Sequence, residues 1–234
     1  YYSGMTFLFL EPLAFISWIG IVFVSSAAAW DRIKELVDKI EVQSEQEKSL
    51  IKINNEEKKL KILFWEKELE FNFDVNRKYV FVGPTGEGKT EILAQLAYLY
   101  KRRGYKIGYV AQNPYVFDDT LEKNLFLGEN ITPEKKDKAL KLLDIFSLKD
   151  LEDSVDKLFK MPLGENGKRL SGGQIKRMCL VRSLLLDSDL YVWDDPFSSV
   201  DLILEKDIIS KLNNLNIFDN KILIFSSDNA LNIR

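Results

Sequence analysis

The sequence contains no histidine and a single cysteine, Cys179, among its 234 residues. Without histidine, this chain cannot supply a Ser-His-Asp triad, a histidine-ligated metal site or a histidine general base. One thiol cannot form an internal disulfide, which fits a reducing compartment for most of the chain. Cys179 is therefore expected to pack in the core rather than to act as a redox centre.

The chain also lacks a strong net charge, since 33 Lys and Arg side chains face 36 Asp and Glu side chains. A net charge of -3 provides no broad basic field, so nucleic acid is not an expected partner. The composition, 46% hydrophobic and 29% charged, excludes a wholly disordered chain. The length leaves room for one sizeable and one small domain.

Charge is scarce in residues 1–30, where Glu11 is the only ionised side chain. The uncharged run from Leu13 to Trp30 would form a helix of about 27 Å, which is just enough to cross a bilayer. We expect a transmembrane helix here, with the rest of the chain cytoplasmic because Arg32 and Lys34 follow directly. A secretory signal is disfavoured because no basic residue precedes Arg32, and a buried core helix is the alternative.

Two further regions follow. Residues 31–60 are rich in both charges and predict a cytosolic helix and linker. Residues 61–234 alternate short apolar runs with helical stretches, which predicts an α/β domain. Because the chain begins with Tyr1 and one span cannot make a pathway, further membrane helices are expected before it.

A phosphate-binding loop is predicted between the strand Tyr79–Val82 and the helical stretch Glu91–Arg103. Its glycines let backbone amides point at phosphate oxygens, and the helix start adds a favourable partial charge. Lys89 should reach the β- and γ-phosphates, and the Thr90 hydroxyl should bind Mg²⁺. The predicted nucleotide-binding residues are Gly83, Pro84, Thr85, Gly86, Glu87, Gly88, Lys89 and Thr90.

A second glycine-rich helix start, LSGGQ at Leu170–Gln174, precedes the helical stretch 175–186. Downstream, the buried strand Leu190–Trp193 ends in Asp194 and Asp195. Carboxylates at this end of a parallel strand face the ligand crevice. We expect Asp194 to hold Mg²⁺ and Asp195 to point toward an attacking water.

These elements, in this order, resemble the nucleotide-binding domain of ATP-binding cassette (ABC) proteins over residues 61–234. The resemblance implies a P-loop ATPase with a mixed sheet, a helical subdomain at about 117–186 and a reduced antiparallel subdomain. It also implies ATP and Mg²⁺ as ligands, and pairing of two domains so that each signature motif serves the partner's ATP. The implied roles are Gln112 as a Mg²⁺ ligand and catalytic residue, Trp65 or Phe64 for adenine stacking, Leu170, Ser171, Gly172, Gly173 and Gln174 as the signature, Ser199 and Asp201 in the D-loop, and Asp228 at the switch position.

The segments 109–128 and 164–174 are similar to those of exporters, in which this domain is coupled to membrane helices. The family usually continues with further helices beyond the point where this chain stops, so a C-terminally shortened domain is expected. DDPFSSVD at 194–201 resembles the first nucleotide-binding domain of C-subfamily exporters.

Two positions depart from the family pattern. Asp195 stands where a catalytic glutamate is usual, and Asp228 stands where a histidine is usual. The shorter acid activates water poorly, and an aspartate at the switch brings negative charge to the γ-phosphate. Both losses weaken hydrolysis at the same site.

We therefore expect an ATP-binding subunit of a membrane ABC exporter that has a degenerate site and completes a competent site on a second half-transporter. Three alternatives are a homodimer with modest hydrolysis, a non-hydrolysing ATP-sensing regulatory subunit, and a P-loop kinase. The LSGGQ and D-loop motifs count against the kinase.

Overall fold

The computed structural model describes residue 34 and residues 59–64 and 67–228 of the chain. The expected transmembrane segment at 1–30, most of the expected linker at 31–60, and Trp65 lie outside these residues. Within the described ranges, no helix is both long enough and apolar enough to cross a membrane. The transmembrane helix and the adenine-stacking role of Trp65 stay predictions.

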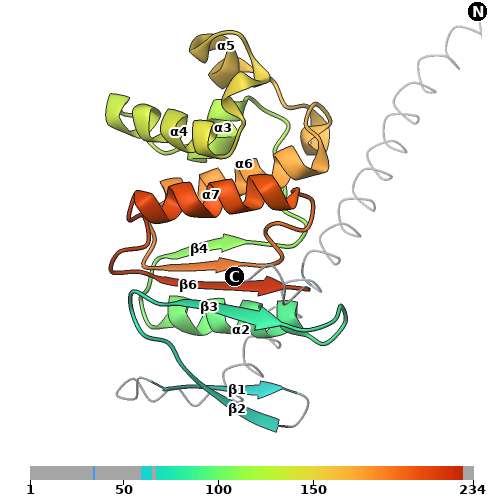
Figure 1. Cartoon of the computed structure of the whole chain (residues 1–234), viewed down its shortest axis with the longest axis vertical. Coiled ribbons are helices and arrows are strands. Elements are labelled where there is room, and N and C mark those ends of the chain that lie inside the picture. The colour runs from blue at the N-terminus through green and yellow to red at the C-terminus, as the bar shows by residue number, and fades with distance from the viewer. Residues whose placement is uncertain (1–33, 35–58, 65–66, 229–234) are drawn as a thin grey trace, which may run out of the picture. The chain divides into compact units, whose positions relative to one another are not determined.

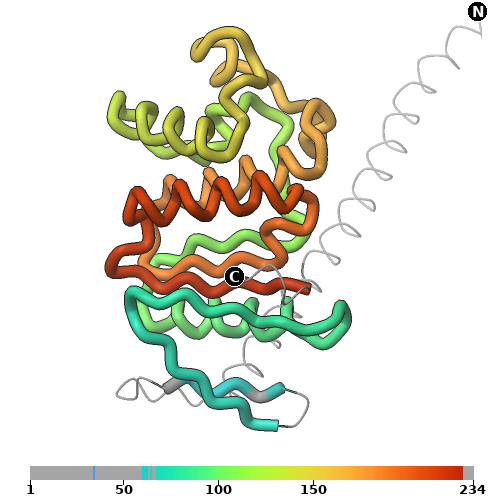
Figure 2. The backbone as a smooth tube through the Cα atoms, viewed as in Figure 1, coloured from blue at the N-terminus to red at the C-terminus, as the bar shows by residue number. Residues whose placement is uncertain are grey.

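A four-stranded parallel sheet forms the centre of the described domain, in the order β3-β6-β5-β4 (Figure 1). Its strands are β3 (Lys78–Val82), β4 (Ile107–Val110), β5 (Leu190–Trp193) and β6 (Ile222–Ser227). The last strand, β6, lies between the early strand β3 and β5, as the backbone path in Figure 2 shows. All four residues of β5 are buried, as its continuous apolar sequence predicts.

An antiparallel pair, β1 (Lys59–Phe64) and β2 (Lys67–Asn72), forms a separate two-stranded sheet. Leu60 and Ile62 alternate along β1 and are almost fully buried, whereas Lys61 between them is exposed. This alternation is typical of a strand with one covered face. Parallel and antiparallel pairings both occur, as expected, but in two sheets rather than one.

Helix α2 (Lys89–Arg102) packs against β4, β5 and β6 and also contacts β1. Its buried residues, which include Leu93 and Leu96, repeat at the helical spacing of three and four. It therefore links the antiparallel pair to the parallel sheet.

The remaining helices form the other part of the domain. They are α3 (Leu121–Phe126), α4 (Pro133–Ile145), α5 (Val155–Lys160), α6 (Gly172–Leu185) and α7 (Leu202–Asn214), with short 3-10 turns at Lys149–Leu151 and Glu165–Gly167. Figure 1 shows α6 and α7 beside the sheet and α3, α4 and α5 beyond them, at the end away from β1 and β2. The hydrophobic core joins both parts and includes Phe146, Phe159, Cys179 and Trp193.

Local sequence explains where these five helices begin. Each has a hydroxyl or carboxylate N-cap that accepts a hydrogen bond from a backbone N–H in the first turn. The caps are Thr120 for α3, Thr132 for α4, Ser154 for α5, Ser171 for α6 and Asp201 for α7. In α4, Pro133 follows the cap at the first helical position, where its missing N–H costs nothing.

The parallel arrangement brings three segments to one edge of the sheet. Val82 of β3 pairs with Ser227 of β6, and Trp193 of β5 pairs with Phe225 of β6. The residues that follow these strands, which are the loop from Gly83, Asp194 with Asp195, and Asp228, therefore leave the sheet side by side. This is the carboxyl edge, where open α/β sheets bind ligands.

Candidate nucleotide-binding site

The glycine-rich loop at 83–90 leads from β3 into α2 through two left-handed glycines, Gly86 (φ +91°) and Gly88 (φ +83°). Gly88 has a second constraint, because the ring of Phe64 stands where its Cβ would be. The Lys89 side chain turns back over the start of the loop and donates to the carbonyl oxygens of Gly83 (2.6 Å) and Pro84 (2.8 Å). The ammonium group thus lies over the loop that is predicted to hold phosphate.

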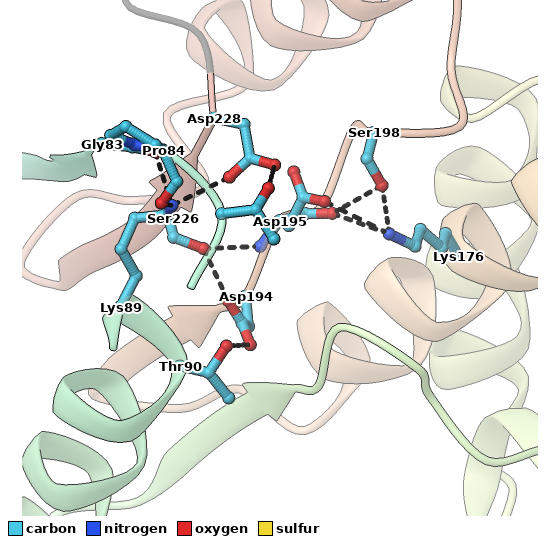
Figure 3. A network of polar contacts seen from close by, with 11 residues as sticks. Gly83, Pro84, Lys89, Thr90, Lys176, Asp194, Asp195, Ser198, Ser226 and Asp228 are labelled. Atoms are coloured by element: carbon cyan, nitrogen blue, oxygen red, sulfur yellow. Dashed lines mark hydrogen bonds and ion pairs between the residues drawn. The ribbon is translucent and has the colours of Figure 1, made fainter. Parts of the chain in front are cut away.

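Asp194 is the buried centre of the site, with 2% of its surface exposed. Its Oδ2 accepts a hydrogen bond from the Thr90 hydroxyl at 2.7 Å, and its Oδ1 accepts one from the Ser226 hydroxyl at 2.6 Å. One carboxylate therefore joins the start of α2, the end of β5 and β6, as Figure 3 shows. Two hydrogen bonds offset the cost of burying this polar group.

Asp195 sits in a left-handed backbone conformation, with φ at +48°. Aspartate tolerates this region better than most residues, and its backbone N–H donates to the Ser226 hydroxyl at 2.8 Å. Its carboxylate lies 3.9 Å from the ammonium of Lys176 in α6. Lys176 also donates to the carbonyl oxygen of Asp195 at 3.0 Å and to the Ser198 hydroxyl, and it approaches from the side opposite Lys89 and Thr90 (Figure 3).

Asp228 follows β6 and reaches across to the glycine-rich loop. Its Oδ1 lies 2.9 Å from the Lys89 ammonium, and its Oδ2 accepts a hydrogen bond from the Thr85 hydroxyl at 2.8 Å. The hydrogen bonds from Lys89 and Thr85 hold the pKa of the Asp228 carboxyl below its usual value. Asp228 is therefore ionised at neutral pH and paired with the loop lysine.

The LSGGQ segment forms the start of α6. Ser171 caps the helix by accepting from the Gln174 backbone N–H at 3.3 Å, and the Gln174 side chain accepts from the Ser171 N–H at 2.7 Å. Leu170 is buried, whereas Ser171 and Gly172 are exposed.

The predicted signature segment lies against the predicted D-loop of the same chain. A Cβ on Gly173 would stand 2.5 Å from the carbonyl oxygen of Ser199. Asp201 caps α7 by accepting from the Leu204 N–H at 2.9 Å. The two motifs therefore meet through a backbone contact that leaves no room for a side chain.

Not every predicted residue joins this network. Gln112 is exposed in the segment after β4, and within the described residues no hydrogen bond joins it to Asp194 or Thr90. Phe64, the alternative to Trp65 for adenine stacking, has its ring against Gly88. Phe64 is thus a described aromatic side chain that lies against the loop.

Sequence reasoning missed two residues of the network, Lys176 and Ser226. Lys176 lies three and four positions after Gly173 and Gly172, so it shares their helix face, which could have identified it. Ser226 lies one position beyond Phe225, the partner of Trp193, just as Asp194 lies one beyond Trp193. A correct strand register would therefore have placed Ser226 beside Asp194.

The oxygen atoms at this edge fit a magnesium ion bound together with a phosphate. The Thr90 hydroxyl and the Asp194 carboxylate form a hard-oxygen pair 2.7 Å apart. Within the described ranges, no group of three or more His, Cys, Asp or Glu side chains could hold a metal ion. Mg²⁺ typically binds through one or two carboxylates together with substrate phosphates, and Thr90 and Asp194 offer oxygens of this kind.

Comparison with known proteins shows which family this chain resembles. A protein-family model described as ABC transporter matches residues 67–198. The multidrug resistance-like ATP-binding protein MdlA of Buchnera aphidicola is 27% identical over 233 residues, covering 88% of this chain and 40% of that protein. ATP-binding cassette sub-family C member 4 of Homo sapiens is 35% identical over 152 residues, covering 59% of this chain and 11% of that protein.

A bacterial Atm1-family ABC exporter, solved with ATP bound, has a similar fold with a TM-score of 0.61 and 22% identity. The match covers 73% of this chain and 33% of that one. This chain thus spans less than half the length of each of these three proteins. Because the family model covers more than half of the chain, we conclude that this chain belongs to the ABC transporter family.

Proposed function

We propose that this chain is the ATP-binding part of an ABC exporter, in which ATP binding and hydrolysis at a domain interface drive transport across a membrane. The main support is the 2.7 Å hydrogen bond between Thr90 and Asp194. It joins the phosphate-binding loop to the acidic end of the neighbouring strand β5, as a Mg²⁺-nucleotide site requires. The membrane role rests on the exporter relatives and on the apolar sequence at 13–30.

In this proposal the loop Gly83–Thr90 binds the phosphates, while Thr90, Asp194 and Gln112 hold Mg²⁺. Bound Mg²⁺ supplies positive charge that stabilises the developing charge on the phosphate oxygens. Gln112, which is exposed here, would take part only when it turns toward the nucleotide. Phe64 or Trp65 stacks on the adenine ring.

We further propose that hydrolysis at this site is slow. Asp195, in the position of the general base, is one methylene shorter than glutamate, and Lys176 lies against its carbonyl and carboxylate oxygens. A displacement of about 1 Å at a reacting group can cost roughly a hundredfold in rate. Asp228 adds a negative charge where the transition state needs a donor.

The signature favours a dimeric working unit. The exposed Ser171 and Gly172 at the start of α6 are available to a phosphate bound by another subunit. We propose that residues Leu170–Gln174 complete the ATP site of a second half-transporter, with the D-loop residues Ser199 and Asp201 at the same interface. A heterodimer explains an intact signature beside a weakened catalytic pair, whereas a homodimer would repeat the weak site twice.

The test restores the catalytic pair in the intact protein, purified alone, with Mg²⁺-dependent ATP turnover as the readout. We expect Asp195→Glu alone to give little gain, because Asp228 still opposes the γ-phosphate. Asp195→Glu combined with Asp228→His should raise turnover, by up to about a hundredfold. The matched control is Asp219→Glu, at an exposed position in the turn before β6.

The outcomes of this test distinguish a degenerate site from a homodimer with weakened sites. High turnover of the unmodified protein, with no gain from the double variant, would contradict a degenerate site. A large gain from Asp195→Glu alone would favour a homodimer whose sites are only weakened.

The non-hydrolysing regulatory subunit remains a second candidate, and the ion pair between Lys89 and Asp228 favours it. A sensor would bind nucleotide and change its dimer equilibrium without turnover in any pairing. An exporter subunit would show turnover when co-purified with a competent partner.

A further inference from the structure

The ammonium group of Lys89 is already fully engaged within this chain. A lysine ammonium has three N–H donors. Here Nζ lies within hydrogen-bond distance of the Gly83 carbonyl (2.6 Å), the Pro84 carbonyl (2.8 Å) and Asp228 Oδ1 (2.9 Å). A phosphate can therefore bind Lys89 only if one of these contacts opens, and Asp228 is the charged competitor among them.

Asp228 is held at a second point and by the sheet itself. The Thr85 hydroxyl donates to its other oxygen at 2.8 Å, so the carboxylate bridges two residues of the loop. Asp228 directly follows Ser227, which pairs with Val82 just before the loop begins. Strand register, rather than a mobile segment, thus places this charge beside the phosphate-binding loop.

Beyond the loop, the surroundings stabilise this charge only weakly, since the charge of Lys176 is the smallest of the causes that lower the pKa of Asp228. Asp194 and Asp195 lie at the same edge, and the loop carries its own carboxylate at Glu87, whose side-chain oxygen lies against Gly83. The other nearby cation, Lys176, is engaged with Asp195 and Ser198. An incoming polyphosphate therefore meets an acidic site whose loop lysine is already paired.

We propose that Asp228 is a specificity-determining residue that makes this site favour nucleoside diphosphates over nucleoside triphosphates. This inference rests on the proposed nucleotide-binding function and adds the class of nucleotide that the site prefers. Asp228 is the only charged partner among the three Lys89 contacts, so a phosphate of either nucleotide displaces it most readily when it reaches the ammonium. Only the triphosphate places a further charged group beside the displaced carboxylate.

The expected change in nucleotide affinity follows from the repulsion between the Asp228 carboxylate and the added phosphate. Two unit charges about 4 Å apart repel enough, even in water, to change affinity by about fivefold, and by more in a partly buried site. Asp228→Asn removes the charge and keeps the size of the side chain. It should therefore lower the ratio Kd(triphosphate)/Kd(diphosphate) by at least about fivefold, while both nucleotides bind more tightly.

The experiment measures displacement of a fluorescent N-methylanthraniloyl-ADP from the full chain in Mg²⁺, with ADP and the β,γ-imido analogue of ATP as competitors. The analogue prevents hydrolysis from confusing the comparison. Asp228→Asn and Asp228→Ala are compared with Asp219→Asn, which removes the same charge from an exposed site outside the network. Asp228→Glu, which keeps the charge, should retain the unmodified preference.

Each outcome has one meaning. A fall of the ratio in Asp228→Asn and Asp228→Ala, but not in Asp219→Asn or Asp228→Glu, supports the inference. An unchanged ratio in Asp228→Asn and Asp228→Ala overturns it and leaves nucleotide binding intact. Absence of any nucleotide binding that depends on Lys89, tested with Lys89→Ala, would instead overturn the proposed function itself.

Discussion

Replacing either signature glycine by alanine gives a sharp test of the contact between the signature and the D-loop. Gly172 and Gly173 are the first two residues of α6. A Cβ on Gly172 would meet nothing within 4 Å, whereas a Cβ on Gly173 would stand 2.5 Å from the Ser199 carbonyl oxygen. The same substitution at adjacent positions therefore isolates the effect of this contact.

The magnitudes follow from helix propensity and steric strain. Alanine is up to about 1 kcal/mol better than glycine in a helix, so Gly172→Ala should leave the unfolding free energy unchanged or raise it by that amount. In Gly173→Ala, overpacking against a backbone carbonyl costs about 1–3 kcal/mol, which exceeds the propensity gain. The unfolding free energies of the two variants should differ by about 1–3 kcal/mol in favour of Gly172→Ala.

Urea unfolding of the two purified variants, followed by tryptophan fluorescence, measures this difference, because Trp193 lies in the core that α6 joins. Equal midpoints and slopes for the two variants would refute the close contact between Gly173 and Ser199. A shift in slope rather than in midpoint would indicate a change in the unfolded chain instead.

Three further predictions concern other parts of the domain. Ser226→Ala removes the hydroxyl that donates to Asp194 and accepts from the Asp195 N–H. The substitution should lower the free energy of unfolding, measured with urea, by about 1–3 kcal/mol. A much smaller decrease in this free energy would mean that the hydrogen-bond network contributes little to stability. Burial raises the pKa of the Cys179 thiol to about 11, so a thiol reagent at pH 8 should label Cys179 only after urea unfolding, and rapid labelling of the native chain would contradict its burial. Burial raises the pKa of Tyr100 to about 12, so the stabilisation that comes from keeping its hydroxyl protonated is complete below about pH 10 and is lost as the pH rises toward 12. The unfolding free energy of Tyr100→Phe should therefore fall less steeply at alkaline pH than that of the unmodified chain. An identical fall in the two proteins would contradict the raised pKa.

Two strands of the central sheet could be predicted from the sequence, because the runs at 79–82 and 190–193 are short, continuous and apolar, whereas β4 was not among the expected strands. Leu190–Trp193 is a strand with the expected bounds, and the loop at 83–90 lies between β3 and α2 as expected. The predicted first residues of two helices differ from the observed ones. The expected helices at 91–103 and 175–186 begin two and three residues earlier, at Lys89 and Gly172, because the glycine-rich turns themselves form the first helical residues.

The side-chain partners within the site could not be predicted in the same way. Asp228 was expected to oppose a γ-phosphate, but its pairing with Lys89 depends on β6 lying next to β3, far away in the sequence. Lys176 lies near Asp195 because α6 passes the end of β5. Such contacts come from strand order and helix packing, which no local pattern encodes.

The central claim is that this chain binds nucleotide while most hydrolysis takes place at a site completed on a partner. The most direct test is Mg²⁺-dependent ATP turnover of the intact protein co-purified with a partner half-transporter, with the P-loop lysine replaced by alanine in one chain at a time. Our account predicts that turnover requires the partner, largely survives Lys89→Ala in this chain, and is lost when the partner's P-loop lysine is replaced. Robust turnover of this chain alone that Lys89→Ala abolishes would contradict the account and make Asp195 a working catalytic carboxylate.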